Sequence, residues 1–186
     1  MISLITILYR PRSTFDYLGQ RYKSNLNAIT TVILLMVGFV LATEFYFMGD
    51  ILHWGLKSIY LTFLVNIGFV LVIAKYMISH ILYWTSRLLK GNSALIDIKT
   101  VVAYSLIPQV FALPFIIFAG LTDEYEQLSA IGLYFLNIVQ ILLILWSLGI
   151  ITLGLVKFNG YRPGMAVLNL VPVFALTLAA YLIWFA

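Results

Sequence analysis

The chain of 186 residues contains no cysteine and only two histidines. The absence of cysteine excludes disulfides, thiolate metal sites and cysteine nucleophiles. A single histidine without carboxylate or thiolate neighbours does not form a metal site. We therefore expect the protein to work without a metal and without a cofactor.

Patterns that indicate catalysis are also missing. The sequence has no glycine-rich phosphate loop, no pair of carboxylates in the predicted cytoplasmic segments and no serine with a plausible histidine base. The acidic residues Asp123, Glu124 and Glu126 share one short loop. Three carboxylates in an exposed loop are more often solvated than bound to a cation. The sequence thus predicts a protein that is not an enzyme.

Charged residues are few and apolar residues dominate. Only 10% of the positions are charged and 63% are apolar, with a mean hydropathy of +1.04. A chain of this length folded in water could not cover that much apolar surface, so its solvent must be lipid. The basic residues that give the net charge of +4 lie in short clusters between apolar runs. We interpret these clusters as topology signals and expect no nucleic-acid partner.

Five apolar stretches reach the length of about twenty residues that one membrane crossing needs. All should be helical, because a strand in hydrocarbon would leave its backbone groups unpaired. The predicted fold is all-α, a polytopic membrane protein of five transmembrane helices. An interfacial segment of residues 1–27 precedes a membrane domain of residues 28–186. The predicted crossings are residues 28–47, 58–82, 101–121, 131–156 and 165–186.

Charge alternates between the segments that connect these crossings. The first connection is assigned Glu44 and Asp50 against Lys57, and the third carries acidic residues alone. The positive-inside rule places the segments rich in lysine and arginine in the cytoplasm and, after five crossings, Ala186 outside. These basic residues are Arg10, Arg12, Arg21 and Lys23 in the N-terminal segment, Arg87, Lys90 and Lys99 in the second connection, and Lys157 and Arg162 in the fourth.

The N-terminal segment is too short and too interrupted to cross the membrane. Ile5, Leu8, Phe15, Leu18 and Tyr22 alternate with polar and charged residues. Pro11, which lies between Leu8 and Phe15, should break the segment into two helical pieces. We expect both pieces to be amphipathic and to lie on the anionic inner leaflet, with the lipid bilayer as their partner.

A few polar residues fall within the predicted crossings. Lys75 lies near the cytoplasmic end of the second crossing, where its side chain can extend to the headgroups. Asn66, Asn137 and Gln140 lie near mid-membrane. Such amides can form hydrogen bonds between helices, or they can line a cavity together with Lys75. Both interpretations remain open at this stage.

Two prolines interrupt the third crossing. Pro108 cannot donate to the carbonyl of Tyr104 and its ring crowds that group, so the helix should bend there, and Pro114 should repeat the defect. Ser105, a neighbouring helix or a trapped water should satisfy the freed carbonyl. We expect Tyr104 at headgroup depth, with its hydroxyl directed toward the Gly91 loop or a partner. The kink has either a docking role or a packing role alone.

Three motifs together resemble the Yip-domain family, the Ypt-interacting-protein superfamily of five-helix membrane proteins, in its short bacterial type. The first motif is similar to the Pro-Arg-x-Thr start of bacterial members, and the third looks like the Ala-Tyr-Ser-x-x-Pro signature of the third helix. The motifs are Arg10-Pro11-Arg12-Ser13-Thr14-Phe15, the stretch from Tyr83-Trp84 through Arg87-Leu88-Leu89-Lys90-Gly91, and Val102-Ala103-Tyr104-Ser105-Leu106-Ile107-Pro108.

The resemblance implies a non-enzymatic membrane scaffold or adaptor. It would act on a membrane-protein partner, on a second copy of itself or on bilayer organisation, in a bacterial inner membrane. The Asp-Leu-Tyr-Gly-Pro motif of eukaryotic members is absent, so binding of a Rab-type GTPase is not expected. The alternative is a small transporter, channel or lipid-handling protein with a path lined by Asn66, Asn137 and Gln140. The motif residues carried forward are Tyr83, Trp84, Gly91, Tyr104, Ser105, Pro108 and Pro114.

Overall fold

A computed structural model describes residues 2–21, 25–51, 59–121 and 126–185. Every regular element in these ranges is a helix, which confirms the predicted all-α class. The elements are α1 (Ile2–Tyr9), α2 (Pro11–Arg21), α3 (Leu26–Ile51), α4 (Ile59–Val70), the π-helix η1 (Leu71–Ile78), α5 (Ser79–Leu88), α6 (Leu95–Ser105), the 3₁₀-helix η2 (Ile107–Ala112), α7 (Leu113–Leu121), α8 (Glu126–Asn159) and α9 (Pro163–Phe185).

The helices form a polytopic membrane protein of roughly five crossings. Within the described ranges, four helical stretches are long and apolar enough to cross a membrane, and α9 contains a shorter apolar helix over Pro163–Ala179. The second crossing was predicted to end at residue 82 but continues to Leu88. The reason is that α5 continues the helix without a break into a more polar stretch. The four long stretches are Leu26–Phe47, Phe63–Leu88, Leu95–Gly120 and Tyr134–Asn159.

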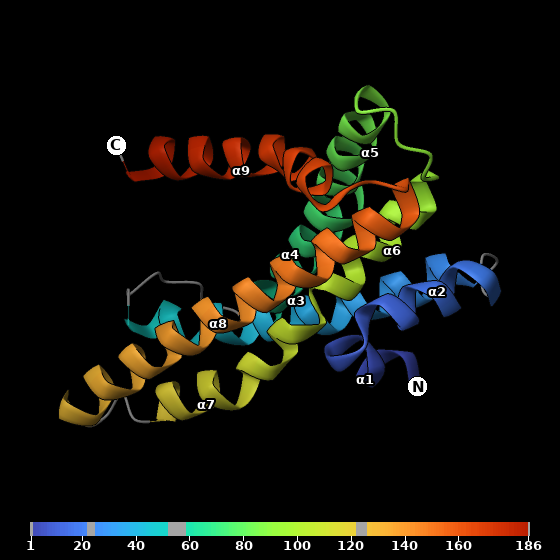
Figure 1. The fold of residues 1–186 in the computed structure, drawn as a ribbon. Coiled ribbons are helices and arrows are strands. Elements are labelled where there is room, and N and C mark those ends of the chain that lie inside the picture. The colour runs from blue at the N-terminus through green and yellow to red at the C-terminus, as the bar shows by residue number, and fades with distance from the viewer. Residues whose placement is uncertain (1, 22–24, 52–58, 122–125, 186) are drawn as a thin grey trace.

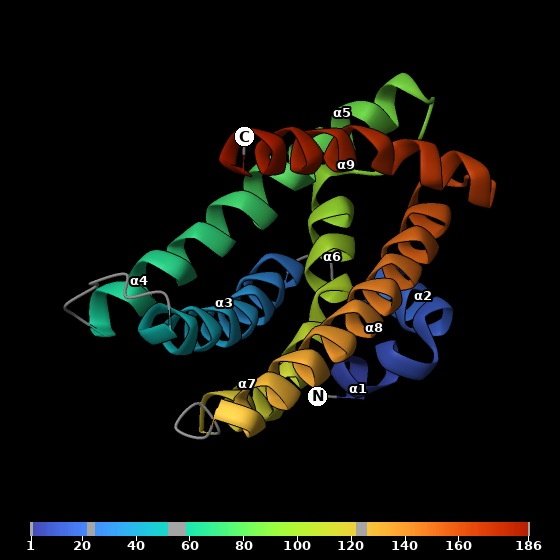
Figure 2. The same ribbon diagram turned by 90° about the vertical axis from the view of Figure 1, so that its left-hand side faces the viewer.

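Successive crossings run in alternating directions. In Figure 1 the end of α3, the start of α4, the end of α7 and the C-terminal end of α9 lie toward the left of the view. The α5–α6 and α8–α9 connections lie toward the right, as does α2. Figure 2 shows α6 at the centre, with α3 and α4 on one side and α8 on the other. Five passes in alternation therefore bring the second and fourth connections to one end.

The core surrounds α6. Its residues from Thr100 to Ser105 are all buried, and Val101, Ala103 and Tyr104 are completely inaccessible. Small and β-branched side chains on this helix allow close contact with α3, η1, α5 and α8. Gly154 on α8 extends this contact, because a Cβ there would meet the methyl groups of Val101.

The N-terminal helices α1 and α2 are part of the same core. Phe15 has no exposed surface, and its ring makes edge contacts with Tyr104 and Phe158 at centroid distances of 6.4 and 5.8 Å. Leu18 is also buried in this core, while Leu8 packs against it and is partly buried. Asp16 forms an ion pair with Lys157 of α8. The apolar contact that the sequence assigned to lipid is, for Phe15 and Leu18, supplied by the chain itself.

The other residues of the N-terminal segment differ from one another in exposure and in contacts. Ile5 is exposed, so its side chain is available to the bilayer. Thr14 links the two short helices, because its hydroxyl lies 3.0 Å from that of Thr6 and 2.9 Å from the carbonyl of Arg10, which accepts. Tyr22, another apolar residue of the predicted amphipathic face, lies outside the described residues.

The third crossing breaks at Pro108, as its sequence predicts. α6 ends at Ser105, η2 carries Pro108 in its first turn, and α7 resumes the α-helix at Leu113. Ser105 donates its hydroxyl to the carbonyl of Val102 at 2.8 Å, and not to that of Tyr104. Pro114 is the second residue of α7, directly after η2. The two prolines therefore lie close to the two ends of the 3₁₀ segment that interrupts the α-helix.

Candidate functional sites

The first candidate site is the joint where α5 turns into α6. Lys90 has a φ of 62°, in the left-handed region. The N–H of Gly91 donates to the carbonyl of Ser86 at 2.8 Å, and that of Lys90 to Arg87 at 3.1 Å. These two bonds form the Schellman pattern that ends many helices and satisfies their last carbonyls. The turn after Leu88 therefore has a defined backbone.

A second helix end meets this turn through a buried polar network. The hydroxyls of Ser86 and Ser93 donate to Asn159 Oδ1 at 2.5 and 2.6 Å, and the hydroxyl of Tyr161 donates to the carbonyl of Ser86 at 2.7 Å. Ser86, Ser93 and Asn159 are almost completely buried. We call this group (Ser86, Gly91, Ser93, Asn159 and Tyr161) the polar joint. It ties the α5–α6 connection to the end of α8.

Gly91 lies at the centre of the polar joint. A Cβ at this position would lie closer than van der Waals contact to Asn159 Oδ1, the Tyr161 hydroxyl and Ser86 Oγ. Only glycine fits, which gives a physical reason for Gly91 in the sequence motif. No sequence pattern marks Ser86, Ser93 or Asn159, because small polar residues beside a connection look the same whether they are solvated or buried.

The polar joint supports an exposed surface on α5 and its C-terminal turn. The side chains of Trp84 and Leu88 are 68% and 83% exposed, and Arg87 and Lys90 are exposed as well. The Arg87 guanidinium lies 5.1 Å from the centre of the Tyr83 ring, which stabilises its position through a cation–π contact. We call Trp84, Arg87, Leu88 and Lys90 the α5 surface. It combines apolar and basic groups on a fixed backbone.

The remaining motif residues lie elsewhere in the third crossing. Tyr104 is fully buried, and its ring packs against Phe15 in the core. Ser105 and Pro108 are buried beside it, and Pro114 is exposed at the start of α7. The structure therefore brings Tyr83, Trp84 and Gly91 together, and separates from them the residues around the bend.

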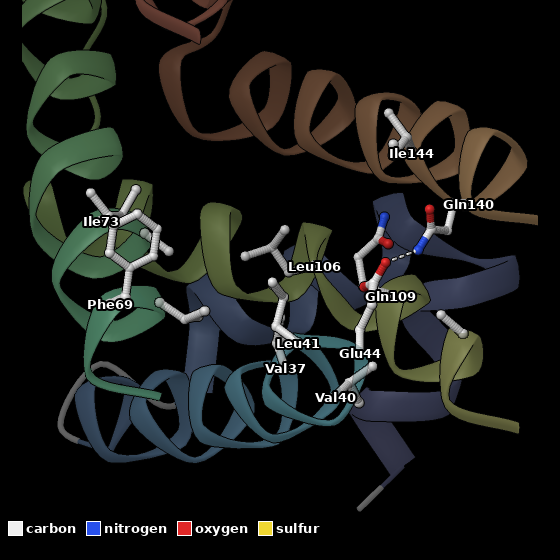
Figure 3. A pocket seen from close by; sticks show the side chains of 13 residues that line it. Val37, Val40, Leu41, Glu44, Phe69, Ile73, Leu106, Gln109, Gln140 and Ile144 are labelled. Atoms are coloured by element: carbon white, nitrogen blue, oxygen red, sulfur yellow. Dashed lines mark hydrogen bonds between the residues drawn. The ribbon is translucent and has the colours of Figure 1, made fainter. Parts of the chain in front are cut away.

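The second candidate site is a cavity of about 340 Å³ within the helix bundle. Figure 3 shows α3 below it, α4 and η1 at one side, Gln109 of η2 at the opposite side and α8 above. Its polar groups, Glu44, Gln109 and Gln140, gather at one end, and the other lining residues are apolar. The apolar lining consists of Val37, Val40, Leu41, Phe69, Val70, Ile73, Ala74, Leu106, Ala112 and Ile144.

Glu44 belongs to α3 and not to the first connection, where its charge had placed it. The helix continues to Ile51, and the side-chain amide of Gln140 donates to the Glu44 carboxylate across the cavity. Gln109 donates its amide to the hydroxyl of Ser147 at 3.2 Å. Glu44 therefore lies within the first crossing, Leu26–Phe47.

The cavity includes one of the four polar residues predicted to line a path. Gln140 lines it, whereas Asn66, Asn137 and Lys75 are not among its lining residues. Asn137 is exposed on α8, one turn from Gln140. Lys75 is 9% exposed on η1, and its ammonium donates to the hydroxyl of Thr31 at 2.6 Å. Lys75 thus connects η1 to α3.

Neither site has the ligands of a metal centre. Among the residues that the structure describes, no group of three or more histidine, aspartate or glutamate side chains could hold a metal ion. The polar joint offers neutral hydroxyls and an amide, and the cavity offers one carboxylate with two amides. Both arrangements favour recognition by hydrogen bonds and apolar contact.

Comparison with known proteins gives one match. The model of the Yip1 domain family matches residues 5–185, nearly the whole chain. No curated protein and no solved structure matches it.

Proposed function

Because the chain belongs to the Yip1 domain family, we propose that this multi-pass membrane protein is a scaffold or adaptor without catalytic activity. The α5 surface would hold a membrane-protein partner. The observation that carries the proposal is the exposure of Trp84 and Leu88 directly beside the buried polar joint. A large exposed aromatic side chain on a rigid backbone is typical of the residues that dominate binding energy at interfaces.

The rigidity of the polar joint favours binding by reducing its entropic cost. Ordering a flexible loop or side chain on binding consumes part of the interaction energy. At this joint the backbone is already held by the Schellman turn and by hydrogen bonds from Ser86, Ser93 and Tyr161. Less ordering is therefore left for the moment of binding.

The charge of the α5 surface indicates the chemistry of its partner. Arg87 and Lys90 are both exposed there, and the sequence has no acidic residue between Glu44 and Asp97 except Asp50. A partner segment with acidic and apolar residues would complement this surface. We propose such a segment of a membrane protein as the occupant, rather than lipid headgroups alone.

The same basic residues support a topology. Arg87 and Lys90 lie at the α5–α6 connection, and Lys157 and Arg162 lie at the α8–α9 connection. Both connections are at the end of the bundle that contains α2 (Figure 1). From the positive-inside rule we propose that this end faces the cytoplasm and that Ala186 lies outside. The proposed membrane is a bacterial inner membrane. The α5 surface would then meet its partner at the cytoplasmic face.

One observation favours the alternative of a transporter or lipid-handling protein: Gln140 lines a cavity between the crossings. The two functions predict different behaviour of the purified protein. Proteoliposomes that contain this chain alone should move no ion, metabolite or lipid if it is a scaffold. Flux that depends on Gln140 would favour the alternative.

Crosslinking tests the partner and its surface. We expect a photoreactive amino acid at Trp84 to give one adduct of constant mass in native membranes. The same photoreactive amino acid at Tyr134, which is 73% exposed on α8, should give no such adduct. The adduct partner is then identified by mass spectrometry and purified, and its affinity for the chain in nanodiscs is measured.

Variants of the α5 surface should weaken that affinity. We expect Trp84→Ala and Arg87→Glu each to raise the Kd about tenfold or more, as loss of an interface anchor does, and Tyr134→Ala to leave it unchanged. An adduct of twice the chain mass would identify a second copy as the partner. Adducts with lipid alone, or equal affinity of all variants, would contradict the proposal.

A further inference from the structure

The cavity between α3, η1, η2 and α8 has the chemistry of a binding site that the docking proposal does not use. We propose that it binds a single-chain amphiphile with a primary ammonium headgroup. The ammonium would lie against Glu44, Gln109 and Gln140, and the alkyl chain along the apolar walls. The inference is independent of the α5 surface, because none of the residues of that surface lines the cavity.

Three acceptor groups converge at the polar end of the cavity (Figure 3). The amide nitrogen of Gln140 donates to Glu44, and that of Gln109 donates to Ser147. Both bonds use the nitrogen and leave the side-chain oxygens as acceptors. Together with the Glu44 carboxylate they offer three acceptors, which matches the three N–H donors of a primary ammonium.

The lining residues contain no cation to balance the Glu44 carboxylate. The nearby ammonium of Lys75, on the same π-helix as the lining residues Ile73 and Ala74, is instead bound to Thr31. A carboxylate in an apolar setting is costly without a charged partner. A cationic ligand supplies the charge that this end of the cavity lacks.

The shape of the cavity selects the apolar part of the ligand. Its volume of about 340 Å³ lies at the lower end of the range for small-molecule sites, which suits one alkyl chain. Phe69 on α4 and Ile144 on α8 line the cavity and are 61% and 50% exposed. Both residues lie within crossings, so the exposed rim to which they contribute faces hydrocarbon. The ligand can therefore enter from the bilayer.

The π-helix η1 shapes one wall of this site. Val70, immediately before η1, and Ile73 and Ala74 within it all line the cavity. A π-helical turn is rare, less stable than an α-helical one and frequently found at functional sites. Its position at this wall agrees with a binding role for the space beside it.

Photolabelling of the full chain in phosphatidylcholine nanodiscs tests the site. The probe is dodecylamine with a diazirine in its tail, and the labelled residues are mapped by mass spectrometry. We expect adducts at the rim residues Phe69 and Ile144. Dodecyltrimethylammonium with the same tail keeps the charge but has no N–H donors, and should label these residues at least about tenfold less. This comparison uses the unaltered protein, so it does not depend on the folding of any variant.

Two variants complete the test. Glu44→Gln should reduce rim labelling by dodecylamine at least about tenfold. Asn137→Ala is the control, because it removes an amide from the exposed face of the helix that carries Gln140. This variant should leave rim labelling by dodecylamine unchanged. Excess lysophosphatidylethanolamine, a single-chain aminolipid, should compete if the natural ligand is an aminolipid, and should fail to compete if it is a free amine. Equal labelling by the two cations, or labelling of Glu44→Gln equal to the parent, would overturn the proposal.

Discussion

Replacing Phe15 by alanine should lower the free energy of unfolding by about 3–5 kcal/mol, the range for a fully buried phenylalanine. Phe15 has no exposed surface and makes edge contacts with Tyr104 and Phe158, so its removal leaves a cavity at the centre of the bundle. The contacts between aromatic rings add to the loss. Reversible unfolding in mixed micelles, followed by circular dichroism, measures the change.

Tyr9→Ala is the matched control, since Tyr9 is an aromatic residue of the same segment that is 64% exposed. We expect its effect to stay within about 0.5 kcal/mol. Equal effects of the two substitutions would mean that α1 and α2 only lie on the membrane surface. The conclusion that Phe15 packs in the core would then be wrong.

Gly91→Ala should lower the free energy of unfolding by about 1–3 kcal/mol, as overpacking of a filled site does. The new methyl group would collide with Asn159 Oδ1, Ser86 Oγ and the Tyr161 hydroxyl, which form the polar joint. At least one of these hydrogen bonds must open, and the α5 surface should lose its fixed backbone. Faster amide exchange over residues 86–94 would report that local loss.

Gly149→Ala provides the control on the neighbouring long helix. A Cβ at Gly149 meets nothing within 4 Å, so alanine fits without a collision. Alanine is the better helix former, and we expect this variant to be as stable as the parent or more stable by up to about 1 kcal/mol. If Gly91→Ala were as stable as Gly149→Ala, Gly91 would have no role in the polar joint.

The crossings and the bend could be predicted because both depend on local properties. The number of apolar residues needed to cross a bilayer is set by the rise of an α-helix. The break at Pro108 follows from a missing N–H and a ring clash at one residue. Neither property requires knowledge of which helices are neighbours.

Contacts between distant residues could not be predicted in the same way. The apolar face of α2 has the same pattern whether Phe15 meets lipid or, as here, Tyr104 of α6. Glu44 was placed in a connection by its charge, and only its pairing with Gln140 explains its place in α3. Asn159 lies 66 positions from Ser93 in the sequence. No local pattern indicates that it accepts a hydrogen bond from the Ser93 hydroxyl.

The topology of the chain is the central claim, because the proposed docking surface requires the α5–α6 connection in the cytoplasm. Fusion of a reporter that is active only outside the cytoplasm tests it directly. We predict activity after Ala186 and no activity at Gly91 or Gly160, since five crossings separate a cytoplasmic N-terminus from the C-terminus. An inactive fusion after Ala186, or an active one at Gly91, would contradict the account.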